Sequence, residues 1–187
     1  PFLKGAMYGH VEIVEKLLAR GSDIDERDNL GRTALILAAT GGHLELARLL
    51  LLSGAACDLQ AENGTTALMA AAHGGYRPLV ELLLERGCSV DLRNGDGETA
   101  LLKAAEEGHT ALIELLAAAS ADIHAEDLRG RTALAVAAER AYTDLIEILS
   151  TLGAGLDPEN ARRLVENAER NGWTDVVELL RRVPERS

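Results

Sequence analysis

Apolar residues recur along the chain at two spacings, a helical one inside short segments and a longer one between segments. Leu46, Leu49 and Leu50 lie three and four residues apart, which predicts a helix over 44–52 with one apolar face. The same leucine position returns every 33 residues, at Leu17, Leu50, Leu83, Leu116 and Leu149. A fixed period of this length predicts an all-α solenoid, in which each unit packs only on its neighbours.

The segment 31–63 illustrates the predicted unit. The Thr33 hydroxyl is placed to cap a short helix that begins at residue 34, and Gly41-Gly42 ends that helix. Helix 44–52 follows, Gly54 supplies a left-handed turn, and a protruding loop closes the unit. One domain over 1–187 is therefore predicted, with a partial repeat at 1–30, full repeats at 31–63, 64–96, 97–129 and 130–160, and a polar C-terminal cap at 161–183.

The repeated residues resemble the ankyrin repeat. The resemblance is carried by Gly31-Arg32-Thr33-Ala34-Leu35 through Gly42-His43, and by Gly21-Ser22-Asp23-Ile24-Asp25. The proline of the family pattern is replaced by alanine in four units, which keeps a helix-compatible site. The resemblance implies helix-turn-helix units with protruding β-hairpin-like loops, a concave face made by the first helices and the loop tips, and protein binding without catalysis on that face.

Charge and hydropathy limit the classes of partner that are expected. The formal net charge is −11, and 47% of the 187 residues are hydrophobic. An acidic chain lacks the lysine and arginine surplus that binds a phosphate backbone, so no nucleic-acid partner is expected. No apolar run approaches about 18 residues, so no membrane partner is expected. We expect a monomer that binds a protein.

The two cysteines lie in different columns of the repeat. Cys57 shares its column with Ile24 and Val90, whereas Cys88 shares its column with Ala55 and Ala121. Because the two columns serve different sites, the sequence predicts two free thiols, with Cys57 in the core. Free thiols are typical of a reducing compartment, so an intracellular and cytoplasmic location is predicted.

The polar motifs favour packing roles over chemistry. His10, His43 and His109 share a column with Tyr76 and Tyr142, which predicts packing and hydrogen bonding at a helix start and not zinc ligation. Residues 94–98 lack the distal ligand of a calcium loop and are interpreted as a loop tip. The column that contains Asp25, Asp58, Asp91, His124 and Asp157 is interpreted as loop hydrogen bonding. No cofactor, metal or enzymatic activity is predicted.

Recognition is expected at concave positions that vary between repeats, among them Thr65, His73 and Gly74. We expect aromatic, arginine and exposed apolar side chains to serve as anchors, together with acids of the second half that face a basic or mixed partner segment. Replacement of Glu106 and Glu107 by lysine is expected to weaken the binding of that partner. The expected partner-binding residues are Tyr8, Leu30, Arg32, Arg93, Asp96, Glu98, Glu106, Glu107, Leu128, Arg129, Arg131 and Arg140.

Two other functions stay open at this stage. The second-ranked interpretation is a regulatory or scaffold domain of a larger multidomain protein or effector, which flanking sequence would reveal. The chain would also suit an engineered repeat scaffold, although the cysteines and the break of the glycine column at Ser120 are unusual for an array built from one optimised unit.

Overall fold

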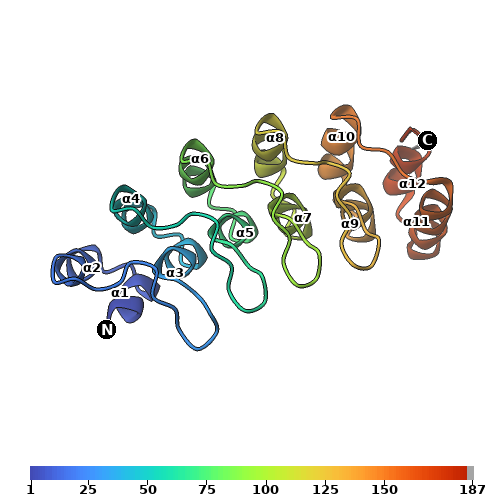
Figure 1. Cartoon of the computed structure of the whole chain (residues 1–187). Helices are drawn as coiled ribbons and strands as arrows, with labels where there is room; N and C mark the ends of the chain where they lie inside the picture. Colours follow the sequence, from blue (N-terminus) through green and yellow to red (C-terminus); the bar gives the residue numbers. More distant parts are fainter. Residues whose placement is uncertain (185–187) are drawn as a thin grey trace.

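A computed structural model describes residues 1–184. The helices of this part form two layers, with each odd-numbered helix up to α9 paired to the helix that follows it (Figure 1). Long loops project from the layer of first helices. The helices are α1 (Phe2–Met7), α2 (Val11–Leu18), α3 (Ala34–Thr40), α4 (Leu44–Leu52), α5 (Ala67–His73), α6 (Arg77–Glu85), α7 (Ala100–Glu106), α8 (Thr110–Ala118), α9 (Ala133–Glu139), α10 (Thr143–Thr151), α11 (Pro158–Asn171) and α12 (Thr174–Leu180).

A threonine caps the first helix of each full repeat, as predicted. The Thr33 hydroxyl accepts a hydrogen bond from the Ile36 backbone N–H at 3.3 Å, and Thr99 accepts one from Leu102 at the same distance. Thr66 and Thr132 cap α5 and α9 in the same way.

The C-terminal cap departs from the prediction. Its first helix begins at Pro158 and not at 161, because the Asp157 carboxylate caps it by accepting from the N–H groups of Glu159 and Asn160.

The core is a continuous layer of Leu, Ala, Ile and Val between the two helix layers. Leu46 on α4 and Leu112 on α8 are almost fully buried, and Leu79 and Leu145 occupy the same column with the same burial. Ile13 stands in that column too, yet 49% of its surface is exposed. Within residues 1–184, repeat 1 contacts repeat 2 alone, so the apolar face that buries these residues elsewhere is incomplete there.

Turns after the second helices use the left-handed conformation, as predicted. Gly54 has φ +93°, and Ser120 is held at φ +65° where the other repeats have glycine. In this region a serine has a steric cost that glycine does not have, on the order of 1 kcal/mol.

The histidine column makes the hydrogen bonds that the sequence predicts. Ring Nε2 of His43 lies 3.1 Å from the Met7 carbonyl oxygen, and that of His109 lies 3.0 Å from the His73 carbonyl oxygen.

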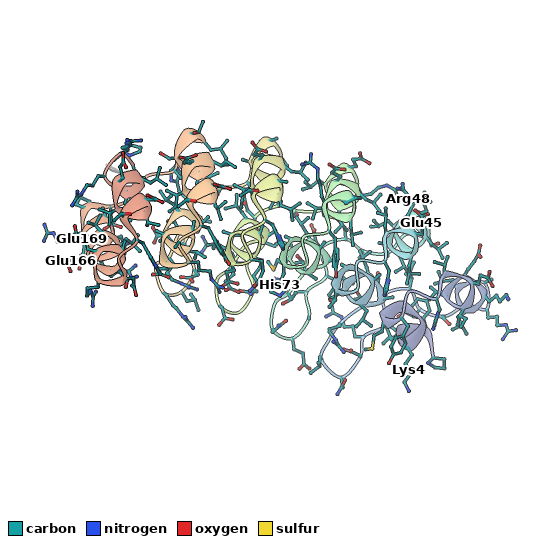
Figure 2. All side chains as sticks on the ribbon, turned by 180° about the vertical axis from the view of Figure 1, so that it is seen from behind. Lys4, Glu45, Arg48, His73, Glu166 and Glu169 are labelled. Atoms are coloured by element: carbon teal, nitrogen blue, oxygen red, sulfur yellow. A yellow bond between two sulfur atoms is a disulfide. The ribbon has the colours of Figure 1, made fainter. Side chains whose placement is uncertain are left out.

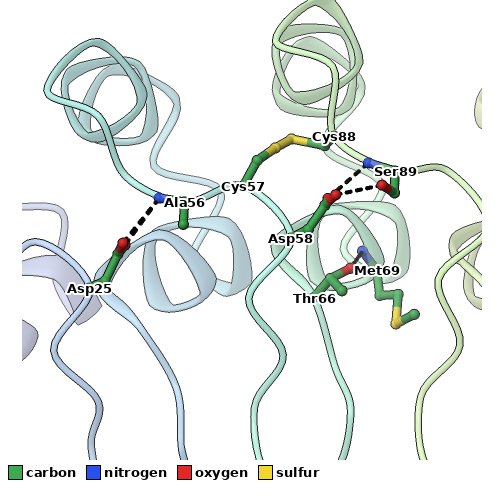
Figure 3. The surroundings of a disulfide bond; sticks show 8 residues. All are labelled: Asp25, Ala56, Cys57, Asp58, Thr66, Met69, Cys88 and Ser89. Carbon is green, nitrogen blue, oxygen red and sulfur yellow. Dashed lines mark hydrogen bonds between the residues drawn. A yellow bond between two sulfur atoms is a disulfide. The ribbon is translucent and has the colours of Figure 1, made fainter.

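The prediction of two free thiols is wrong. Cys57 and Cys88 form a disulfide across repeats 2 and 3, with their Cα atoms 5.4 Å apart (Figure 3). Neighbouring units meet at this level with an offset of 31 residues and not 33. The same offset joins the carboxylate of Asp25 to the N–H of Ala56, and that of Asp91 to the N–H of Asp122.

The disulfide also changes two dependent predictions. Cys57 is half-buried rather than a core thiol, and the argument from free thiols to a reducing compartment no longer applies. Separately, no helix among residues 1–184 combines the length and the apolar character needed to cross a membrane.

Candidate functional site

The loop tips form a row that is tied together by backbone hydrogen bonds. The N–H of Glu62 donates to the carbonyl of Leu30 at 2.9 Å, and the N–H of Leu128 donates to the carbonyl of Asp96 at 2.9 Å. Between them, Gly95 donates to Asn63 at 2.8 Å. Two apolar side chains project from this row, because Leu30 is 49% exposed and Leu128 is 77% exposed.

Side chains reinforce the same row at 33-residue steps. The Arg27 guanidinium donates to the Gln60 carbonyl at 2.7 Å, and the Gln60 amide donates to the Arg93 carbonyl at 2.8 Å. The Arg93 guanidinium in turn donates to the Glu126 carbonyl at 2.8 Å. Arg93 therefore supports the neighbouring loop while it remains exposed at the surface.

A chain of ion pairs crosses the floor of the concave face in the second half of the array. The Lys103 ammonium lies 3.2 Å from Glu98 and 2.5 Å from Glu106. The Arg131 guanidinium lies 2.7 Å from Asp127 and 3.7 Å from both Glu106 and Glu139. Arg163 of α11 completes the series at 3.0 Å from Glu139. We call this set the ion-pair chain, and its members are Glu98, Lys103, Glu106, Asp127, Arg131, Glu139 and Arg163.

The ion-pair chain shifts the pKa values of Asp127 and Lys103. Burial alone would raise the pKa of Asp127, but hydrogen bonds from the Arg131 backbone and guanidinium lower it below its ordinary value of 3.8. Burial opposes the charge of Lys103 as well, and its contacts with Glu106 and Glu98 raise its pKa nonetheless. The charges on this floor are therefore largely compensated within the molecule.

The lowered pKa of Asp127 predicts a loss of stability in acid. A carboxyl whose folded-state pKa is depressed stabilises the fold above its unfolded pKa, and this contribution disappears as the pH falls through the folded value. At pH 7 we expect the native chain to have a larger free energy of unfolding than the Asp127→Asn variant. We expect this difference to shrink below about pH 4. Urea titrations from pH 7 to pH 3 measure it. The control is Asp96→Asn, which changes an exposed loop-tip residue. If the difference in unfolding free energy between the native chain and Asp127→Asn stays constant with pH, the prediction is contradicted.

A recess opens on the concave face where repeat 3 carries small residues. Its volume is about 220 Å³, and α3, α5, α7 and two loops line it. Thr65 stands where other repeats have Arg32, Glu98 and Arg131, and Ala70 stands where they have Leu37, Lys103 and Val136. The lining residues are Thr40, Thr65, Met69, Ala70, His73, Gly74, Asn94 and Lys103.

The recess lies centrally in the array. His73, on its rim, is seen near the middle of the row of repeats, whereas Lys4, Glu166 and Glu169 lie toward the two ends (Figure 2). Glu107 approaches His73 Nδ1 to 3.7 Å and keeps an exposed carboxylate at this rim. The arrangement offers an apolar hollow beside an acidic group.

Comparison with known families identifies the repeat. The family model described as ankyrin repeats, in three copies, matches residues 2–94 and 78–160. The chain belongs to the ankyrin repeat family. No curated protein matches it. Ankyrin repeats generally act as protein–protein interaction modules, so a binding role is the general expectation for this array.

The structure of the ankyrin array divides the twelve expected binding residues into two groups. Four have side chains engaged in ion pairs within the molecule, namely Arg32, Glu98, Glu106 and Arg131. The other eight are exposed at the surface, namely Tyr8, Leu30, Arg93, Asp96, Glu107, Leu128, Arg129 and Arg140. Reversal of Glu106 would therefore disturb the ion-pair chain as well as any interface, whereas Glu107 tests the acidic rim alone.

None of the eight residues that line the recess is among the twelve expected binding residues, although Thr65, His73 and Gly74 were named as variable concave positions. The signal that points to them is the reduced size of repeat 3 at several concave columns at once, which appears only when repeats are compared position by position. Elsewhere, the Asn94 side chain accepts from the N–H groups of Asp96 and Glu98, so the calcium-like segment is a self-bonded turn. Among residues 1–184, Cys57, Asp58 and Cys88 group like metal ligands, but the two sulfur atoms are bonded to each other.

Proposed function

We propose that this ankyrin array binds one segment of a partner protein along its concave face, with an apolar side chain of the partner in the recess of repeat 3. The observation that carries the proposal is the hollow lined by Thr65, Ala70 and Gly74, which are small at positions where most other repeats have larger side chains. A buried apolar anchor is the usual source of binding energy in such an interface.

The surroundings of the recess support a particular partner chemistry. In the second half of the array the concave floor is filled by the ion-pair chain, whose acids already have cationic partners. The first half has exposed apolar groups, since Tyr8 at the C-terminal end of α1 and Leu30 in the loop between α2 and α3 are both exposed. A partner segment with an apolar anchor followed by a basic residue matches the hollow and the carboxylate of Glu107.

Filling the recess tests the proposal with residues that the array itself carries. Thr65→Arg with Ala70→Leu places at repeat 3 the side chains that repeat 2 has at Arg32 and Leu37. Peptides selected from a displayed library on the native chain should bind this double variant at least about tenfold more weakly, since a lost apolar anchor costs more than 1.4 kcal/mol. Isothermal titration calorimetry measures the affinity.

The matched control also copies a residue from other repeats, but on the outer face of the array. Ala111→Glu copies Glu12 and Glu45 onto an exposed position at the start of α8, away from the recess. It should leave the affinity of the selected peptides unchanged. Equal binding by the native chain and the recess-filled variant, with both folded by circular dichroism, would contradict the proposed site.

A further inference from the structure

The glycine that follows a first helix is covered by a ring from the next repeat. A Cβ atom at Gly42 would lie 2.7 Å from Cε1 of Tyr76, well inside the usual contact distance between carbon atoms, so the ring rests directly on the glycine. Each ring belongs to the residue that precedes a second helix. The other pairs of this kind are Gly9 with His43, Gly75 with His109, and Gly108 with Tyr142.

A histidine in this position also contacts a backbone carbonyl of the repeat before it. Ring Nε2 of His43 lies 3.1 Å from the carbonyl oxygen of Met7, which stands two residues before Gly9. His109 makes the same contact with the residue two before Gly75. The last carbonyls of a helix lack partners within the helix, so the ring satisfies one of them. A junction between repeats therefore binds a ring through a bare glycine and a nearby carbonyl.

The last unit has this glycine without a ring. Gly172 follows α11 with φ +72°, close to the +69° of Gly42, and no atom of residues 1–184 lies within 4 Å of the place where its Cβ would stand. A pocket of about 600 Å³ opens there, and we call it the end pocket, defined by Gly172, Trp173, Thr174 and Val177. Trp173 is half-buried and Val177 is buried, so the floor of the end pocket is apolar.

The rim of the end pocket carries compensated charges. Glu169 pairs with Arg181 at 2.9 Å, and Glu178 pairs with Arg182. Each pair joins one acid to one base, so the rim does not select a charged ligand. The carbonyl of Arg170, two residues before Gly172, lies in the last turn of α11 and is equivalent to the carbonyls that the histidine rings contact.

The outer face of α11 does not suit a whole further repeat. Glu166 stands in the column of the buried residues Met69 and Leu102, and Glu169 stands in the column of the buried Ala105. Both acids are exposed at the far end of the array (Figure 2). Stacking a full helix pair on this face would bury carboxylates, which is unfavourable. The face is therefore suited to receive one ring from a helix end and not a complete repeat.

We propose that the end pocket binds a tyrosine or histidine ring that a partner protein presents at the start of a helix. The ring lies over Gly172 and beside the indole of Trp173, where aromatic contact adds to the burial of apolar area. A histidine ring also donates from Nε2 to the Arg170 carbonyl. The contact continues the series of rings that joins the repeats. It does not rest on the proposed function, because the end pocket shares no residue with the recess of repeat 3.

Nuclear magnetic resonance of the whole isotope-labelled chain tests the end pocket with N-acetyl-tyrosinamide as the probe. The Gly172 amide and the indole N–H of Trp173, the one tryptophan of the sequence, should shift and reach saturation. N-acetyl-histidinamide should shift the same two signals. N-acetyl-leucinamide, which is apolar but has no ring, should bind roughly fivefold more weakly, since it lacks the aromatic contact.

A substitution at the glycine blocks the place of the ring. Gly172→Asn should weaken the tyrosine probe at least about tenfold, because its side chain occupies the space above the backbone. Asparagine tolerates positive φ, and Ala141 at φ +56° shows that this column accepts a side chain. The matched control is Gly130→Asn, since Gly130 has φ +71° and open space around its Cβ position but lies in a loop. It should leave binding unchanged.

Four results would overturn the proposal. They are the absence of a saturable shift at Gly172, equal binding of the tyrosine and leucine probes, equal affinities for the native chain and Gly172→Asn, and shifts confined to His73 and Gly74. The comparison of the two probes uses the native chain, so it holds whether or not the variant folds. The recess of repeat 3 is tested by its own variants, so the two proposals fail separately.

Discussion

Replacing Leu112 by alanine should lower the free energy of unfolding by about 2–5 kcal/mol, the usual range for truncation of a buried leucine. The side chain lies on the inner face of α8 and is only 1% exposed. It packs in the middle of the array, with repeats on both sides, so little relaxation can fill the space that its removal leaves. Urea denaturation followed by circular dichroism measures the change.

The repeat provides an internal control for this prediction. Ile13 occupies the same column as Leu112, but it is 49% exposed because, within residues 1–184, repeat 1 packs against one neighbouring repeat. Ile13→Ala should therefore cost no more than about 1 kcal/mol, in proportion to the smaller apolar area that it removes from water. Equal losses for the two variants would mean that this column does not derive its stability from contacts between repeats.

Replacing Arg131 by methionine should destabilise the fold by roughly 2–3 kcal/mol, because it leaves carboxylates of the ion-pair chain without a counter-charge. The Arg131 side chain is 19% exposed, and that of its main partner Asp127 is 3% exposed. Methionine keeps most of the apolar stem of arginine, so the loss reports on charge and hydrogen bonds more than on packing. Thermal unfolding at low and high salt measures it, and the low dielectric of the site should make the effect weakly salt-dependent.

Arg32 is the matched control for this variant. It holds the same column three repeats earlier and makes the same pair, with Asp28 at 2.7 Å, but its side chain is 30% exposed and within residues 1–184 it pairs with no second acid. Arg32→Met should cost about 1 kcal/mol or less, as for other exposed ion pairs. A similar loss in both variants would show that the wider ion-pair chain adds nothing to the single pair.

The sequence was sufficient for the architecture because each unit repeats a local signal. The threonine caps, the leucine faces and the left-handed turns all act within a few residues, so they could be inferred one unit at a time. The contacts between units were harder to predict. Cys57 and Cys88 meet because adjacent loops are offset by 31 residues, and a comparison of equivalent positions at 33 residues separates them.

The candidate site also combines features that could be predicted from the sequence with features that could not. Exposure of Tyr8, Leu30 and Leu128 could be anticipated from their places at a helix end and at loop tips. Most of the ion pairs that engage Glu98, Glu106 and Arg131 lie within one repeat, at spacings of three to five residues that could have indicated them. The contact between Arg131 and Glu106 depends on the distance between neighbouring repeats, which no local signal encodes. These residues were expected to contact a partner because they vary between repeats, and variation of that kind does not distinguish an interface from an internal network.

The ties between the loop tips have a consequence for affinity. Each tip donates a backbone hydrogen bond to the tip before it, and the side chains of Arg27, Gln60 and Arg93 add a second series of bonds. Four loops that would otherwise sample many conformations independently are therefore ordered before any partner arrives. A protein that contacts Leu30 and Leu128 together would lose little conformational entropy from this side of the complex, so even a small interface there can be long-lived.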